Sequence, residues 1–155
     1  MSRKHSAGLV IYRRRESFLE VLLVHPGGPF WAKRDLGAWS IPKGEFDPTV
    51  EADALAVARR EFEEETGFSP SGEVVPLADI RQPSGKIIHA WAVEGDFDAS
   101  RARSNTFSME WPPRSGRFRE FPEVDRACWF PISEAKQRIL PGQTGFLEQL
   151  ERLIR

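Results

Sequence analysis

Three glutamates near residue 65 are the residues best suited to chemistry in this chain. Glu61, Glu64 and Glu65 follow an alanine-rich run, and Gly67 comes soon after them as a candidate helix cap. At about 100° per residue, the three carboxylates share one arc of roughly 100° on a helix. Carboxylate oxygens suit Mg²⁺ or Mn²⁺, and either ion keeps coordination sites for water and phosphate. The spacing therefore indicates a site for a hard divalent cation.

A solvated acidic face is the competing interpretation of this cluster. Like charges spaced i,i+3 and i,i+4 each cost a helix about 0.2–0.5 kcal/mol. Anions in the last turn also oppose the helix dipole, by about 0.3–1 kcal/mol each. A bound cation offsets both costs, whereas a solvated face explains neither. Leu55, Ala58 and Phe62 occupy the adjoining arc, so this helix is expected to pack on one side and to present carboxylates on another.

The elements around this helix predict the fold. Segments rich in β-branched residues predict strands over residues 8–12 and 19–25, and the second is apolar on both faces, as an interior strand is. A third strand, 39–45, ends in a glycine turn before the helix. We further expect a hairpin of 74–81 with 86–93, strands at 107–111 and 128–130, and helices over 133–140 and 146–154. This order predicts an α/β fold, an α/β/α sandwich with a central mixed sheet.

Composition limits the class of protein. The chain has 155 residues, 40% of them hydrophobic, which predicts a single domain over residues 1–155. No apolar run approaches the roughly 18 residues of a membrane span, so no membrane partner is expected. Cys128 is the only cysteine, and we expect it to be a buried structural thiol in a cytoplasmic protein. A net charge of −1 gives no general attraction to polyanions, so a nucleotide would be bound by local groups.

The acidic segment resembles the signature of the Nudix hydrolases, G-x5-E-x7-R-E-U-x-E-E-x-G-U, in which U is apolar. Residues 60–68, Arg-Glu-Phe-Glu-Glu-Glu-Thr-Gly-Phe, match the second half of this signature at every fixed position. The first half departs from it, because Gly44 stands two residues too far from Arg60 and Ala52 stands where the glutamate belongs. Glu51, one residue earlier, is the candidate replacement, since the family glutamate pairs with the signature arginine.

The resemblance implies hydrolysis of a nucleoside diphosphate linked to another group, with Mg²⁺ on the signature helix and Mn²⁺ as a substitute. Carried over by position, Glu61, Glu64 and Glu65 are metal ligands, and the carbonyl oxygen of Lys43 is a further ligand. Glu61 is also a candidate base. Arg60 is expected to orient the carboxylates.

Two further segments are similar to one branch of the family. Residues 40–44 contain a Pro-Lys-Gly turn, which looks like that of diadenosine tetraphosphate hydrolases and bacterial RNA pyrophosphohydrolases. Glu123, six residues before Trp129, looks like the additional glutamate of such enzymes, and it is a candidate accessory ligand or base; a simple loop acid is the alternative. These similarities favour a Mg²⁺-dependent pyrophosphohydrolase that cleaves a phosphoanhydride in a dinucleoside polyphosphate such as diadenosine tetraphosphate.

Other functions stay open. Hydrolysis of nucleoside triphosphates or of 5′-triphosphate RNA uses the same chemistry, although an RNA 5′ end is the less favoured partner. The displaced signature glutamate permits an inactive Nudix-fold module that binds nucleotides. A cation-binding structural domain would need no polyphosphate contact. The sequence is compatible with a monomer or a homodimer.

Candidate substrate contacts lie mostly outside the signature. Aromatic rings can stack on bases, and cationic or amide groups can bind phosphates. The candidates are Lys43, Arg81, Gln82, Lys86, Trp91 and Trp111, followed by Phe107 and the arginines of segment 114–119. Each has a structural alternative. The aromatic residues and His89 can be buried core residues, and the arginines can be solvent-exposed loop residues.

Overall fold

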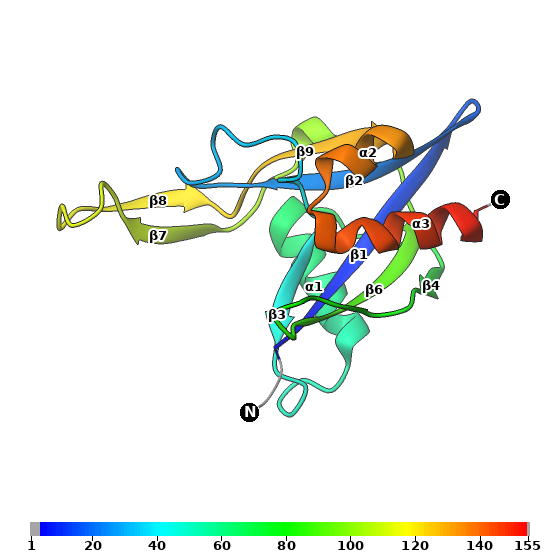
Figure 1. Ribbon diagram of the computed structural model, residues 1–155, viewed down its shortest axis with the longest axis horizontal. Coiled ribbons are helices and arrows are strands. Elements are labelled where there is room, and N and C mark those ends of the chain that lie inside the picture. Colours follow the sequence, from blue (N-terminus) through cyan, green and yellow to red (C-terminus); the bar gives the residue numbers. More distant parts are fainter. Residues whose placement is uncertain (1–3, 155) are drawn as a thin grey trace.

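Within the described residues, 4–154, seven strands form a mixed central sheet, and residues 1–3 and 155 of the predicted domain lie outside this description (Figure 1). The long strand β1 (His5–Arg15) runs parallel to β6 (Ile87–Glu94) and antiparallel to β2 (Phe18–Pro26). The remaining strands are β3 (Lys43–Phe46), β4 (Val74–Pro76), β5 (Ile80–Arg81) and β9 (Val124–Pro131). The order β4-β6-β1-β2-β9 places β2 in the interior, as expected.

One edge of β1 is shared between two antiparallel partners. Residues 5–8 of β1 pair with β3, whereas residues 12–15 pair with β2. Between them, the Leu9 N–H donates to the Pro42 carbonyl at 3.2 Å, and Val24 and Ser40 exchange backbone hydrogen bonds of 2.9 Å. The two partners therefore diverge from β1, and we call this divergence the fork between β2 and β3.

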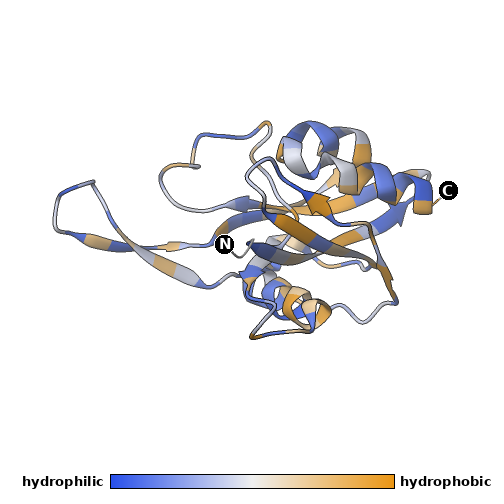
Figure 2. Ribbon diagram, turned by 60° about the horizontal axis from the view of Figure 1, so that its bottom comes forward, coloured by the Kyte–Doolittle hydropathy of each residue, from blue (hydrophilic) through white to orange (hydrophobic). Residues whose placement is uncertain are grey.

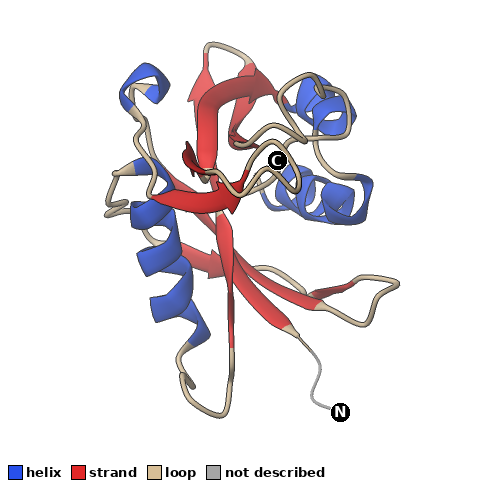
Figure 3. Cartoon of the chain, turned by 90° about the vertical axis from the view of Figure 1, so that its left-hand side faces the viewer, coloured by secondary structure: helices blue, strands red, loops and turns tan. Residues whose placement is uncertain are grey.

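Helices cover both faces of the sheet (Figures 2 and 3). Helix α1 (Ala54–Thr66) packs on one face, where Leu9 and Ile11 of β1 meet it. Helices α2 (Ile132–Arg138) and α3 (Thr144–Leu153) pack on the other face. Short 3₁₀ helices, η1 (Ala99–Arg101) and η2 (Pro141–Gln143), lie in the connections. This arrangement confirms the predicted α/β/α sandwich with a mixed sheet, and among the described residues no helix is long and apolar enough to cross a membrane.

Two strands form a separate ribbon. Strands β7 (Thr106–Glu110) and β8 (Phe118–Pro122) pair only with each other, and they project from the body of the molecule (Figure 1). We call residues 106–122 the ribbon. The sequence predicted β7 but placed residues 114–119 in a loop, so the second strand was missed because its apolar and charged residues do not form a long strand pattern.

Other boundaries also differ from the prediction. The expected strand 39–45 is interrupted at Pro42, which has no N–H to donate, and it resumes as β3. Similarly, the predicted hairpin is present, but its first strand divides into β4 and β5 after Pro76. The expected cap at Ser133 is wrong, because the N-cap of α2 is Pro131, two residues earlier, and it makes no side-chain cap bond.

Phe62 joins α1 to the sheet, and its side chain is fully buried. The substitution Phe62→Ala is expected to lower the free energy of unfolding by about 3–5 kcal/mol, because it removes a large buried side chain and leaves a cavity. Urea unfolding measures this change. Glu63→Ala, on the exposed side of the same helix, is the control and should change the free energy by less than about 0.5 kcal/mol. Equal effects of the two substitutions would contradict this packing.

Candidate active site

The ends of helix α1 are fixed by local chemistry. The Asp53 side chain accepts a hydrogen bond from the Ala56 N–H at 3.1 Å, and this closes the first turn. Gly67 ends the helix with a φ of 80°, a left-handed conformation that favours glycine. Val57, Ala58 and Phe62 are buried beneath the helix. The predicted division into a packing side and a carboxylate side is therefore correct.

The two inserted residues before the helix are absorbed by a turn. Asp47 accepts hydrogen bonds from the N–H and the hydroxyl of Thr49, at 2.9 and 2.7 Å, and its carbonyl accepts from the Glu51 N–H. Glu51 then meets the Arg60 guanidinium through contacts of 2.5 and 3.3 Å. This guanidinium lowers the pKa of the Glu51 carboxyl. The expected replacement of the signature glutamate by Glu51 thus holds in the structure.

Glu61 lies directly against Gly44. A Cβ atom at Gly44 would stand 2.0 Å from Cδ and 2.2 Å from Oε2 of Glu61, so only glycine leaves room for this carboxylate. Burial raises the pKa of Glu61, and the charges of Glu64 and Glu123 raise it further. The Arg60 guanidinium, 3.6 Å from the Glu61 carboxylate, acts in the opposite direction.

Glu65 lies beside Lys43, which directly precedes Gly44 in the turn. The Lys43 N–H donates to Oε2 of Glu65 at 3.2 Å. Burial raises the pKa of Glu65 to about 8, and the charges of Glu61 and Glu123 add to the increase. Glu123, from the β8–β9 connection, is therefore close enough to act on both helix carboxylates. Its expected role as an accessory ligand or base stays a prediction.

A cavity of about 210 Å³ opens next to Glu65 and Glu123. Lys43 also lines it, and Trp31 contributes an aromatic wall from the loop of residues 27–37. Trp31 was missed by the sequence interpretation, although an aromatic pair, Phe30-Trp31, directly after a Pro-Gly-Gly-Pro turn was a usable signal.

Two lysines add positive charge at the turn. Burial lowers the pKa of Lys43 to about 8, and the neighbouring Lys86 ammonium contributes to this decrease. Lys86 itself forms an ion pair of 3.1 Å with Glu45. Lys43 and Lys86 thus lie close to each other, with Lys43 in the cavity lining and Lys86 paired with Glu45, and their contacts with phosphate stay a prediction.

The other predicted substrate contacts are more scattered. Trp91 is half-buried, packs against the core cluster beneath α1 and is not among the residues that line the cavity, so its stacking role stays a prediction. Arg81 is exposed at β5, and the Gln82 side chain lies against Gly142. Trp111 belongs to the ribbon, where its ring meets Phe30 at 5.6 Å between centroids.

His89 and Cys128, both expected to be structural, contact other protein groups. His89 contacts Asp79 and His5 at 2.9 Å each. Cys128 in β9 is half-buried against the core, and burial raises the pKa of its thiol.

The donor set has the right chemistry for a hard cation, but its side chains do not yet converge. Across residues 4–154, no three His, Cys, Asp or Glu side chains are arranged to hold a metal ion as they stand. Glu61 and Glu64 lie 3.6 and 4.0 Å from Arg60 instead. Burial, and to a lesser degree the neighbouring carboxylates, raise the pKa values of Glu61 and Glu65, so a cation would stabilise their charged forms.

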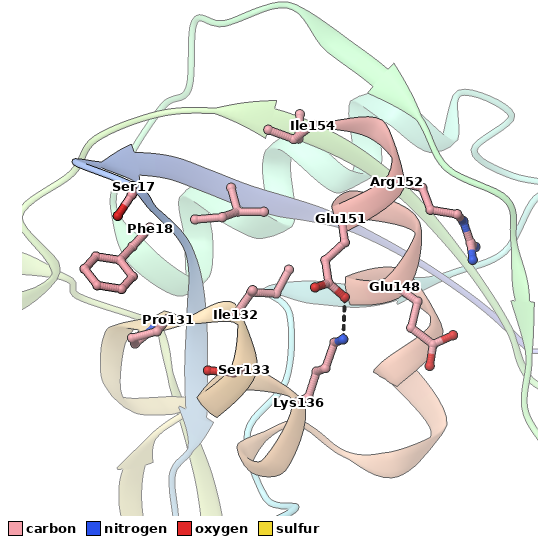
Figure 4. A pocket seen from close by; sticks show the side chains of 11 residues that line it. Ser17, Phe18, Pro131, Ile132, Ser133, Lys136, Glu148, Glu151, Arg152 and Ile154 are labelled. Carbon is pink, nitrogen blue, oxygen red and sulfur yellow. Dashed lines mark ion pairs between the residues drawn. The ribbon is translucent and has the colours of Figure 1, made fainter.

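A larger cavity, of about 710 Å³, lies elsewhere, between the β1–β2 turn, α2 and α3 (Figure 4). Phe18 and Ile132 contribute apolar surface, and Lys136 and Glu151 form an ion pair within it. None of the predicted site residues lines this cavity. Its size alone therefore does not make it the reaction site.

A helix that presents carboxylates to a glycine turn, within an α/β/α sandwich, defines a Nudix-type domain. The chain matches the NUDIX domain family model over residues 2–150 and belongs to this family. This membership supports the prediction of a pyrophosphohydrolase. A comparison with curated protein sequences gave no significant match.

Solved structures of this fold are similar to the chain at low sequence identity. The NUDIX domain of Shewanella oneidensis NrtR, complexed with ADP ribose, has a TM-score of 0.69 and 17% identity, covering 100% of this chain and 90% of that chain. A binary complex of C. elegans Ap4A hydrolase has a TM-score of 0.65 and 20% identity, covering 96% and 97%. A mutT/nudix family protein from Listeria innocua has a TM-score of 0.64 and 17% identity, covering 99% and 96%. These similarities establish the fold.

The contact between Gly44 and Glu61 gives a test of the site. Gly44→Ala should weaken Mn²⁺ binding by at least about tenfold, because the added methyl group displaces the Glu61 carboxylate. Isothermal calorimetry measures the affinity. Gly85→Ala is the control: its Cβ meets nothing within 4 Å, so its positive φ of 92° tests backbone strain alone. Unchanged Mn²⁺ affinity in Gly44→Ala would contradict a role for Glu61 in metal binding.

The pKa of Glu65 predicts a pH dependence of stability without metal. Between its ordinary value of 4.5 and about 8, folded Glu65 keeps a proton that the unfolded chain has released. The free energy of unfolding should therefore fall as pH rises through this window. Thermal unfolding in a chelator at pH 5–8 measures the trend, and Glu65→Gln should make it shallower. Parallel profiles for the two proteins would show that Glu65 is not the group responsible.

Proposed function

We propose that this protein is a divalent-cation-dependent pyrophosphohydrolase that cleaves a phosphoanhydride in a nucleotide polyphosphate, with dinucleoside polyphosphates such as diadenosine tetraphosphate preferred. The observation that carries the proposal is the gathering of Glu61, Glu65 and Glu123 around the Lys43-Gly44 turn, next to a cavity. Such a concentration of partly buried carboxylates is unfavourable in the absence of a cationic ligand.

Glu61, Glu64 and Glu65 are the proposed metal ligands, with the Lys43 carbonyl oxygen completing the set and Glu123 as an accessory ligand or base. Mg²⁺ bound there supplies charge neutralisation for the phosphate oxygens, and Mn²⁺ can replace it. Arg60, held by Glu51, keeps the carboxylates oriented when the cation is absent.

Hydrolysis needs a water molecule, a base and a stabilised leaving group. The water oxygen attacks phosphorus, its proton passes to a carboxylate, and the phosphorus–oxygen bond to the leaving phosphate breaks. Glu61 suits the role of base, because its raised pKa increases its affinity for that proton. Lys43, which lines the cavity, and the neighbouring Lys86 are the proposed partners of the phosphate oxygens.

The preference for dinucleoside polyphosphates rests on the Pro-Lys-Gly turn and on the position of Glu123 beside the helix carboxylates. The likeness to the C. elegans Ap4A hydrolase is consistent with it at the level of the fold. The inactive-module alternative rested on the displaced signature glutamate, and it is weakened because Glu51 regains the contact with Arg60. The half-buried Cys128 is compatible with a reducing compartment, and we include a cytoplasmic location in the proposal.

A product-resolved screen with Mg²⁺ and Mn²⁺ tests this function. Diadenosine tetraphosphate should yield ATP among its products and be turned over faster than nucleoside triphosphates, 5′-triphosphate RNA or ADP ribose. Faster turnover of one of these other compounds would replace the preferred substrate, and metal-dependent turnover of none would favour a binding module.

Glu64→Gln tests the metal ligands. It should lower kcat/KM by more than about 100-fold, because loss of a supporting contact near a metal alone costs about 10–100-fold. Glu63→Gln, which removes the same charge from the exposed side of the helix, should retain wild-type turnover. Full activity of Glu64→Gln would exclude this residue as a metal ligand.

A further inference from the structure

The two faces of the ribbon differ in chemistry. Side chains alternate between faces along a strand, and directly paired residues share a face. Phe107 pairs with Phe121 and Met109 with Arg119, while the opposite face contains the pairs Ser108–Glu120 and Glu110–Phe118. By the same alternation, Trp111 and Arg117 continue the first face. We call this face, formed by Phe107, Met109, Trp111, Arg117, Arg119 and Phe121, the aromatic face.

The aromatic face is turned toward the loop that walls the cavity. A Cβ atom at Gly28 would lie 3.1 Å from the Phe107 ring, and Phe30 meets Trp111 edge-on. Phe30 nevertheless stays 62% exposed. Its neighbour in sequence, Trp31, lines the cavity beside Glu65 and Glu123. Aromatic surface therefore extends from the cavity wall onto the ribbon.

The arginines of the ribbon are available for an anionic ligand. Arg114, Arg117 and Arg119 are exposed, and none forms an ion pair with a carboxylate in the part of the chain that the structure describes. The guanidinium of Arg119 lies 5.5 Å from the centre of the Phe121 ring. The rings of Phe107, Trp111 and Phe121 are half-buried, and Phe30 beside them is exposed. Partly exposed rings beside arginines without carboxylate partners match a nucleobase joined to phosphate.

The base of the ribbon is bonded to the carboxylate helix. The Asn105 N–H donates to the Glu64 carbonyl at 3.0 Å, and the Glu123 N–H donates to the Asn105 carbonyl at 2.8 Å. Arg119 precedes Glu123 by four residues. Along an extended strand, four residues span about 13 Å. This is the scale of a polyphosphate with a nucleoside at its end. The cavity of about 210 Å³ is too small for two nucleosides, since pockets that hold a drug-sized ligand measure about 300–1,000 Å³.

We propose that the aromatic face and Phe30 form a subsite for the second nucleoside of a dinucleoside polyphosphate, with Arg117 and Arg119 binding the phosphates next to it. The inference rests on the proposed function and extends it to a part of the chain outside the family signature. The subsite would make the enzyme select substrates with a nucleoside at both ends.

Two substrates with four phosphates each test the subsite. Diadenosine tetraphosphate has a second adenosine, and adenosine 5′-tetraphosphate lacks it. Phe30→Ala should lower the ratio of their kcat/KM values about tenfold, as expected for the loss of one stacked base. Phe118→Ala, an exposed phenylalanine on the opposite face, is the control and should leave the ratio unchanged. A ratio that Phe30→Ala leaves intact, or lowers no more than Phe118→Ala does, overturns the subsite.

The arginines are tested by the double variant Arg117→Ala/Arg119→Ala. It should raise KM for diadenosine tetraphosphate about tenfold, with kcat retained, because Arg117 and Arg119 lie away from the bond that breaks. Arg101→Ala, at an exposed arginine in η1, should leave KM unchanged. An unaltered KM in the double variant overturns the assignment of Arg117 and Arg119.

Binding measurements separate this subsite from the proposed function. If neither substrate is turned over, calorimetry without divalent metal should still give tighter binding of diadenosine tetraphosphate than of adenosine 5′-tetraphosphate, and Phe30→Ala should remove the difference. A twelve-nucleotide single-stranded RNA is the competing occupant. If Phe30→Ala weakens RNA binding while the preference between the two nucleotides is unchanged, the subsite for a second nucleoside is overturned.

Discussion

The close approach of helix α1 to the β3 turn is the constraint on which the site depends. Glu61 occupies the space that a side chain at residue 44 would need, and the Lys43 N–H reaches Glu65 in the same approach. Both contacts require α1 to pack close to the surface of the sheet. Phe62, Val57 and Ala58 hold it there, since all three are buried beneath the helix. The packing of the core beneath α1 therefore also fixes the position of the carboxylates in the candidate site.

This closeness carries an electrostatic cost that the surrounding groups only partly offset. Burial and neighbouring charges raise the pKa values of Glu61 and Glu65. Arg60 provides positive charge, and Glu51 in turn holds Arg60. Because Arg60 is partly exposed, solvent screens much of its effect. A divalent cation would therefore neutralise these carboxylates better than Arg60 does. The turn of residues 47–50 keeps Glu51 in contact with Arg60 despite the two residues inserted in the signature.

The sequence predicted those parts of the site that depend on local spacing. The arc of Glu61, Glu64 and Glu65, the cap at Gly67 and the partnership of Glu51 with Arg60 all follow from helix geometry or from position in the signature. The prediction was weaker where partners distant in the chain decide the outcome. Trp91 packs against the core cluster because β6 pairs with β1, and strand β8 exists because it pairs with β7. Trp31 reaches the cavity only through the path of a long loop, which no periodic pattern describes.

The fork between β2 and β3 separates the candidate metal site from the loop that lines the cavity. The carboxylates stand on α1 and face the β3 branch, whereas the loop with Phe30 and Trp31 leaves from the end of the β2 branch. Since the branches use different stretches of β1 for their hydrogen bonds, the loop can change in length or composition without disturbing the hydrogen bonds of β3. The loop can then vary while Lys43 and Gly44 keep their contacts with α1. A designer would therefore alter the loop first and leave the base of the ribbon intact, because Asn105 bonds it to α1.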